Sequence, residues 1–177
     1  MHMRSEKPQT EVKNIFVDLD ETLIHTNLDK ENPNEVPEVP VNIDPRPRKQ
    51  DLYPASLRPG ANELLFQLRS IGNVFMLTRA IHPYALAMNK QFNLAFPENR
   101  IYSRRDVENY RYKELRIPSG KNYLIDDLLE SANYEKITLI SQLGSVKYIR
   151  VLPFYGSKNE ALTTSMIGDI VSTIRND

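Results

Sequence analysis

Short apolar runs alternate along this chain with segments of helical periodicity, and three of the runs end in polar side chains. The runs that we interpret as strands are residues 14–20, 73–78, 122–127 and 146–154. The segments that we interpret as helices are residues 62–72, 82–92 and 159–174. Short strands separated by helices are typical of a parallel sheet that is covered on both faces. The sequence therefore predicts an α/β fold.

The polar ends of these strands predict one shared site. The first run ends in Asp18 and Asp20, the second in Thr78, and the third in Asp126 and Asp127. Ligands of parallel sheets bind at the carboxyl ends of the strands, so these side chains are expected along one edge. The alternative is a set of separate solvated turns that never meet, and the pattern "IFVDLDET" disfavours it.

Carboxylates that crowd together need positive charge, which Mg²⁺, Ca²⁺ or a salt bridge to lysine or arginine can supply. The sequence has no calcium loop with its regular carboxylate spacing. Mg²⁺ takes carboxylate oxygens and is the usual partner of phosphate, so Mg²⁺ is the favoured cofactor.

A carboxylate beside Mg²⁺ can attack phosphorus and form an acyl phosphate that water then hydrolyses. We assign the attack to Asp18, the proton transfers to Asp20 and a hydrogen bond to phosphate to Thr78. A lysine is also expected, because the transition state spreads negative charge over the phosphoryl oxygens. Lys113 is favoured over Lys121, which would lie at the amino end of the strand that ends in Asp126 and Asp127, far from the cluster.

These residues resemble the motifs of a known superfamily. "DLDET" matches the DxDxT signature of the haloacid dehalogenase (HAD) superfamily of aspartate-nucleophile phosphatases. "DLDETLIHT", "LRPGANELLFQL", "NVFMLTRAIHPYA" and "YRYKEL" resemble its FCP/SCP-like (NLI interacting factor-like) branch, which contains phosphatases of the RNA polymerase II C-terminal domain. The resemblance implies a Rossmann-like core without a large cap domain.

The resemblance also implies a role for each motif residue. The implied metal ligands are Asp18, Asp20 (through its backbone carbonyl), Asp126 and Asp127. Asp18 would be the nucleophile and Asp20 the acid/base. Thr78 and Lys113 would hold the phosphoryl group.

Six of the 12 prolines lie in residues 27–56, which predicts an extended loop or a hairpin rather than a helix. This proline-rich segment is interpreted either as a flap over the site or as a variable surface insertion. Residues 1–12 are expected to form a flexible arm, and residues 13–177 a single phosphatase domain.

A site without a cap suits a phosphate that is carried by a macromolecule. The predicted function is therefore hydrolysis of a phosphomonoester on a protein, with a nucleotide or nucleic-acid-end phosphatase as the alternative. Arginines and tyrosines are interleaved in residues 100–116, which makes Arg104 and Arg105 candidate substrate contacts, and Arg79, directly after Thr78, is a third candidate. The alternative for most residues of 100–116, and the favoured one, is a solvated surface. A non-catalytic phosphoacceptor or binding domain is a remote alternative, because the lysine precedes the second acidic pair and every catalytic position is filled.

The composition limits the partners, the chemistry and the cellular compartment that are expected. Lysine plus arginine and aspartate plus glutamate both number 23, so net charge does not indicate a nucleic-acid partner or an anionic membrane. The chain has no cysteine, which excludes disulfides and thiol catalysis. It has no apolar run long enough to span a membrane, and its polar N-terminus does not resemble a signal peptide. A soluble, cytoplasmic protein is expected.

Overall fold

The computed structural model describes residues 11–29, 33–43, 51–109 and 117–177, and a five-stranded parallel sheet forms its centre. The strand order is β6-β5-β1-β7-β8, and all neighbouring strands are parallel. The strands are β1 (Lys13–Val17), β5 (Asn73–Leu77), β6 (Ile101–Tyr102), β7 (Lys121–Asp126) and β8 (Val146–Arg150). Val17 of β1 lies opposite Met76 and Ile125, so the three strands with polar ends are adjacent and in register.

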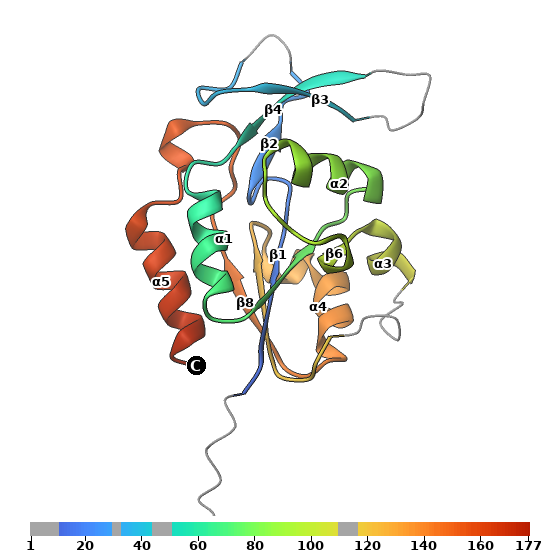
Figure 1. Cartoon of the computed structure of the whole chain (residues 1–177), viewed down its shortest axis with the longest axis vertical. Helices are drawn as coiled ribbons and strands as arrows, with labels where there is room; N and C mark the ends of the chain where they lie inside the picture. The colour runs from blue at the N-terminus through green and yellow to red at the C-terminus, as the bar shows by residue number, and fades with distance from the viewer. Residues whose placement is uncertain (1–10, 30–32, 44–50, 110–116) are drawn as a thin grey trace, which may run out of the picture.

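Helices cover both faces of this sheet (Figure 1). They are α1 (Ala61–Arg69), α2 (His82–Gln91), α3 (Arg104–Asn109), α4 (Tyr134–Ser141) and α5 (Thr164–Arg175). Alternate residues of β1 point to opposite faces. Ile15 and Val17 belong to the core that α1 and α5 cover, whereas Phe16 belongs to the core that α3 and α4 cover. The predicted α/β class with helices on both faces is confirmed.

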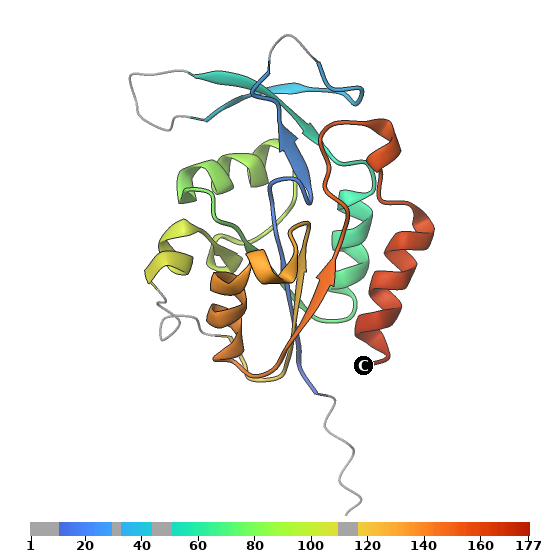
Figure 2. The same ribbon diagram turned by 180° about the vertical axis from the view of Figure 1, so that it is seen from behind.

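A small antiparallel sheet lies over the carboxyl ends of the central strands, as Figures 1 and 2 show. It has the order β2-β4-β3, from β2 (Ile24–Thr26), β3 (Val39–Asn42) and β4 (Leu52–Leu57). The proline-rich segment thus supplies strands to an insertion sheet, which agrees with the hairpin interpretation. The predicted arm falls mostly in residues 1–10, outside the described residues, and the division into arm and single domain stays a prediction.

The helix α5 begins later than residue 159, where the apolar periodicity placed its start. The Thr163 side chain accepts a hydrogen bond from Met166 N and caps the helix there. Just before it, Leu162 N donates to Pro59 O, and Gly60 turns the chain into α1 with a φ of 89°. A Cβ at Gly60 would lie 2.2 Å from Leu162 O, so the two segments approach each other more closely than a larger residue permits. No helix of the described residues is long and apolar enough to cross a membrane.

Candidate active site

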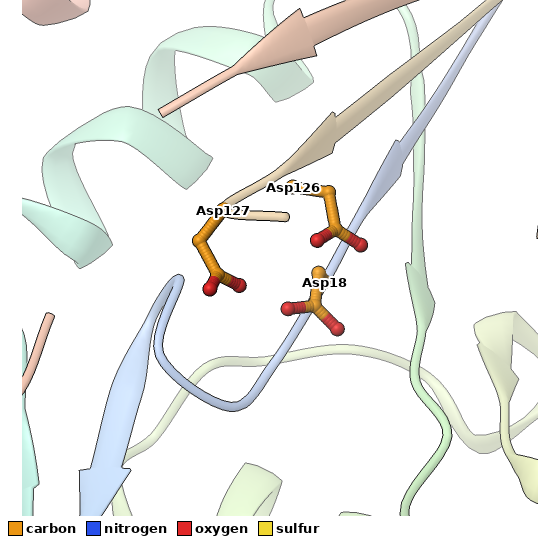
Figure 3. Close-up of side chains that lie close together, drawn as sticks. All are labelled: Asp18, Asp126 and Asp127. Atoms are coloured by element: carbon orange, nitrogen blue, oxygen red, sulfur yellow. The ribbon is translucent and has the colours of Figure 1, made fainter. Parts of the chain in front are cut away.

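The acidic residues that follow β1 and end β7 meet at the carboxyl edge of the sheet. β1 ends at Val17, and Asp18 N then donates to Ile125 O at 3.0 Å, so the pairing with β7 extends one residue beyond the strand. Asp126 is the last residue of β7, and Asp127 follows it. Figure 3 shows the carboxyl groups of Asp18, Asp126 and Asp127 turned toward one another.

The loop after Asp18 is fixed by a buried arginine. Arg58, from the "LRPG" stretch, is 1% exposed, and its guanidinium donates to Thr22 O at 3.2 Å and to Glu160 O at 2.7 Å. Its backbone N also donates to Leu23 O. The same arginine thus holds the loop of the first motif and the segment before α5. Burial lowers the pKa of Arg58, but an arginine remains charged at any working pH.

Three buried carboxylates form a cluster that suits a divalent cation. One carboxylate oxygen from each of three buried residues lies within 4.8 Å of the other two; the residues are Asp18, Asp126 and Asp127. Burial raises the pKa of both Asp18 and Asp127, and the Asp126 charge raises them further. A set of hard oxygen donors with excess negative charge is what Mg²⁺ binds. The residues present therefore fit the predicted cofactor.

Thr22 joins two members of this cluster. Its hydroxyl lies 2.9 Å from Asp18 Oδ2 and 3.1 Å from Asp127 Oδ1, and the residue is fully buried. A hydroxyl carries one proton, so it serves one carboxylate at a time. Thr22 therefore sets the spacing of the two carboxylates.

A buried lysine that the sequence analysis missed completes the cluster. Lys136 Nζ lies 2.7 Å from Asp18 Oδ1 and 2.8 Å from Asp126 Oδ2. Burial alone would lower the pKa of Lys136, but the two carboxylates outweigh it and raise the pKa, so the side chain is an ammonium. A salt bridge and a divalent cation can therefore occupy the cluster together, because three carboxylates and one ammonium leave two negative charges for the cation.

A sequence signal for Lys136 exists in retrospect. Lys136 lies three and four residues before Leu139 and Ile140, which are the buried apolar residues of α4. Positions with this spacing share one face of a helix. A lysine on the apolar face of a short helix indicates a buried charge that needs an anionic partner.

Asp20 lies apart from the triad and has its own partner. Tyr84 Oη, from α2, donates to Asp20 Oδ1 at 2.8 Å, and Thr26 Oγ1 lies 2.7 Å from the same phenol oxygen. Burial raises the pKa of Asp20 to about 6, and the Tyr84 hydrogen bond opposes the rise. A carboxyl group of this kind exchanges protons near neutral pH, as an acid/base requires. The expectation that β1 continues regularly to Asp20 is wrong, because the strand ends at Val17.

Thr78 and Arg79 line a cavity of about 330 Å³ together with Asp18, Asp20 and Asp127. Thr78 follows β5, is 1% exposed, and its Oγ1 accepts from Ala80 N at 3.0 Å. The hydroxyl proton is then available to a ligand oxygen. Arg79 pairs with Glu135 of α4 at 3.1 Å on the rim.

Two of the predicted substrate contacts, Arg104 and Arg105, do not reach the cavity. Arg104 Nε donates to Arg79 O, and Arg105 lies beside His82. Neither residue lines the cavity. Lys121 is the first residue of β7, at the opposite end of the strand from Asp126, and pairs with Glu11. Lys113 lies outside the described residues, so its predicted role stays a prediction.

Two solved structures share this fold. One is "Structure of fission yeast RNA polymerase II CTD phosphatase Fcp1-R271A bound to beryllium fluoride", with a TM-score of 0.50 and 19% identity over 91% of this chain and 50% of that chain. The other is "The Structure of Fcp1, an essential RNA polymerase II CTD phosphatase", with a TM-score of 0.55 and 17% identity over 91% of this chain and 48% of that chain. This chain thus spans about half the length of either.

No curated protein sequence matches the chain significantly. A family model described as "NLI interacting factor-like phosphatase" matches residues 13–160. This range includes all the motif residues discussed above and most of the chain. The chain therefore belongs to the NLI interacting factor-like phosphatase family, of the HAD type.

Proposed function

We propose that this protein hydrolyses phosphomonoesters in a Mg²⁺-dependent reaction that passes through an aspartyl phosphate on Asp18. The observation that carries the proposal is the buried cluster of Asp18, Asp126 and Asp127, of which Asp18 and Asp127 line one cavity with Thr78. The ion would be held by the carboxylates of Asp18, Asp126 and Asp127 and by the backbone carbonyl of Asp20. When bound, Mg²⁺ supplies positive charge to the phosphoryl oxygens and orients them.

The side chains divide the reaction between them. The Asp18 carboxylate attacks phosphorus, and the bond between phosphorus and the leaving oxygen breaks. Asp20 gives its proton to that oxygen and afterwards takes a proton from the water that attacks phosphorus. The bond between phosphorus and Asp18 then breaks, which releases phosphate and restores the Asp18 carboxylate. The Thr78 hydroxyl donates to a phosphoryl oxygen and holds the group in line.

The proposed substrate is a phosphate carried by a protein. The cavity lies at the carboxyl ends of the central strands. The small insertion sheet lies over this edge, in the place of a large cap domain (Figure 2). The two related structures are described as phosphatases of the RNA polymerase II CTD, a protein segment. Arg104 and Arg105 were candidate contacts for either kind of substrate, and because neither lines the cavity, they favour neither. A nucleotide or nucleic-acid-end phosphatase stays the alternative.

The first experiment compares the protein with its Asp18→Asn variant on an aryl phosphate and on phosphoserine peptides, with Mg²⁺ and with EDTA. Turnover is expected only for the unchanged protein with Mg²⁺. Phosphorylated oligonucleotides and nucleotides serve as the comparison substrates. Equal rates for the unchanged protein and Asp18→Asn on every substrate would end the proposal.

The predicted lysine is tested in the same assay. Lys113→Ala is expected to abolish turnover, whereas Lys121→Ala is expected to leave it unchanged, because Lys121 pairs with Glu11 at the far end of β7. The opposite pattern would remove Lys113 from the proposed site.

A further inference from the structure

We propose that Lys136 is a catalytic residue of this site, whose ammonium contacts the nucleophile Asp18 and binds the phosphoryl group that Asp18 accepts. This inference rests on the proposed function. It adds a residue from α4, a segment outside the motifs that resemble the HAD superfamily. Lys136 Nζ already touches a reacting group, since it lies 2.7 Å from Asp18 Oδ1. It also lines the cavity that would receive the substrate.

Lys136 occupies a position that a lysine without anionic partners would not occupy. The side chain is 2% exposed, and a buried ammonium requires close carboxylates to offset its desolvation. Lys136 is also the third residue of α4, near the helix N-terminus, where the helix dipole disfavours a cation. Residues that break local rules in this way are expected at functional sites.

The start of α4 is held firmly against the loop that follows Asp127. Asn133, which precedes α4, is fully buried, and its Nδ2 donates to Tyr148 Oη at 3.1 Å. Tyr148 Oη in turn donates to Leu128 O at 2.7 Å. The helix that carries Lys136 is therefore connected to the acidic end of β7 through β8. Such support keeps a catalytic group in place during the reaction.

The chemistry gives the ammonium a definite task. An ammonium has three N–H donors, and the carboxylates of Asp18 and Asp126 use two of them, which leaves one for a phosphoryl oxygen. When Asp18 attacks, a P–O bond forms at its carboxylate, the bond to the leaving oxygen breaks, and Asp20 donates a proton to that oxygen. Lys136 transfers no proton. It stabilises the negative charge on the phosphoryl oxygens beside Asp18.

The absence of cysteine from the sequence permits a direct test. Lys136→Cys introduces a single thiol, which 2-bromoethylamine converts to a side chain of nearly the same length with an ammonium at its end. Iodoacetamide converts the same thiol to a neutral side chain. Alkylation of the unfolded protein followed by refolding gives access to the buried position. Lys121→Cys, at the far end of β7, receives identical treatment as the matched control.

Two measurements are made on each folded protein. Turnover of a phosphomonoester should fall by about 10²-fold or more in Lys136→Cys, return with the aminoethyl group, and stay low with the carbamidomethyl group. Binding of beryllium fluoride, a mimic of the phosphoryl group on aspartate, is measured by calorimetry at saturating Mg²⁺. It should follow the same pattern. Lys121→Cys should match the unchanged protein throughout.

The second measurement separates catalysis from structure. If Lys136 only neutralised buried carboxylates, a folded Lys136→Cys protein saturated with Mg²⁺ would bind beryllium fluoride normally, and that result would overturn the inference. Turnover within threefold of the unchanged protein would overturn it too. A failure of the proposed function looks different, because the unchanged protein would then have no turnover for Asp18→Asn to abolish.

If Lys136→Cys does not fold, Lys136→Arg provides the test. It keeps the positive charge beside the carboxylates, but its planar guanidinium cannot place a nitrogen at the same point. Lys136→Arg should fold and lose at least tenfold in affinity for beryllium fluoride. Unchanged affinity in this variant would contradict the inference.

Discussion

The Tyr84 hydroxyl of α2 donates to Asp20 Oδ1 at 2.8 Å, although the two residues are 64 positions apart in the sequence. Thr26 of β2 lies 2.7 Å from the same hydroxyl, so the insertion sheet also contributes to this contact. Two hydrogen bonds of the Tyr84 hydroxyl thus connect the proposed acid/base to a helix and to the small sheet. The contact orients one oxygen of Asp20, and the other remains for proton transfer.

Tyr84→Phe should therefore reduce turnover according to the leaving group. A serine alkoxide needs a proton from Asp20 as it departs, whereas a nitrophenolate departs without one. We expect kcat for a phosphoserine peptide to fall about tenfold, with a smaller effect on nitrophenyl phosphate. The ratio of the two rates is the measurement. Tyr134→Phe on the exposed face of α4 is the control, and an equal loss on both substrates would contradict the proposed role.

The stability of the metal-free protein should depend on the protonation of Asp20. Burial raises the pKa of this carboxyl from 3.8 to about 6, so the folded state holds the proton more tightly than the unfolded state does. The resulting stabilisation is fully present below pH 3.8 and is lost as the pH rises through about 6. Asp20→Asn stays neutral at every pH. It should be more stable than the unchanged protein at pH 8, and the difference should disappear near pH 4.

Urea unfolding in EDTA between pH 4 and pH 8 measures this difference. The exposed Asp169→Asn serves as the control for the substitution itself. A stability difference between Asp20→Asn and the unchanged protein that does not change with pH would show that burial does not alter the protonation of Asp20. Loss of activity together with increased stability is the expected behaviour of a group kept for chemistry.

Thr22→Val should weaken both the fold and the metal site. The substitution keeps the shape of the side chain but removes the hydroxyl that lies between Asp18 and Asp127. Loss of a donor to a buried carboxylate costs about 1–3 kcal/mol. Urea unfolding should show this loss, and a Mg²⁺ titration should show reduced affinity. Thr22→Ser retains the hydroxyl and should stay close to the unchanged protein; a loss as large as that of Thr22→Val would point to the methyl group instead.

Arg58→Met should destabilise the protein without touching the proposed chemistry directly. The guanidinium supplies hydrogen bonds to the buried carbonyls of Thr22 and Glu160, and a methionine leaves both without that donor. We expect a loss of about 3 kcal/mol in the free energy of unfolding, with reduced turnover because the loop after β1 moves. The exposed Arg104→Met is the control. A loss of less than about 0.5 kcal/mol, the range of ordinary surface substitutions, would show that Arg58 does not anchor the loop.

Much of the proposed site follows from the sequence for a simple physical reason. Apolar strands flanked by helices form a parallel sheet, and parallel strands all end at the same edge. Asp18, Thr78 and Asp127 each follow directly on such a strand and line one cavity once the sheet forms. Asp126 is the last residue of β7 and lies beside them. Local pattern alone is sufficient for these residues, because the backbone hydrogen bonds of the sheet determine their relative positions.

Other parts of the site were decided by tertiary contacts. Tyr84 reaches Asp20 from another helix, and the start of α5 depends on the Thr163 cap after Leu162 meets Pro59. Lys136 is the clearest case, because a lysine is ordinarily exposed and its local sequence gives it no partner. It is buried in this fold because two carboxylates provide the opposite charge that offsets its desolvation. One is Asp18, 118 residues away in the sequence, and the other is Asp126, 10 residues away.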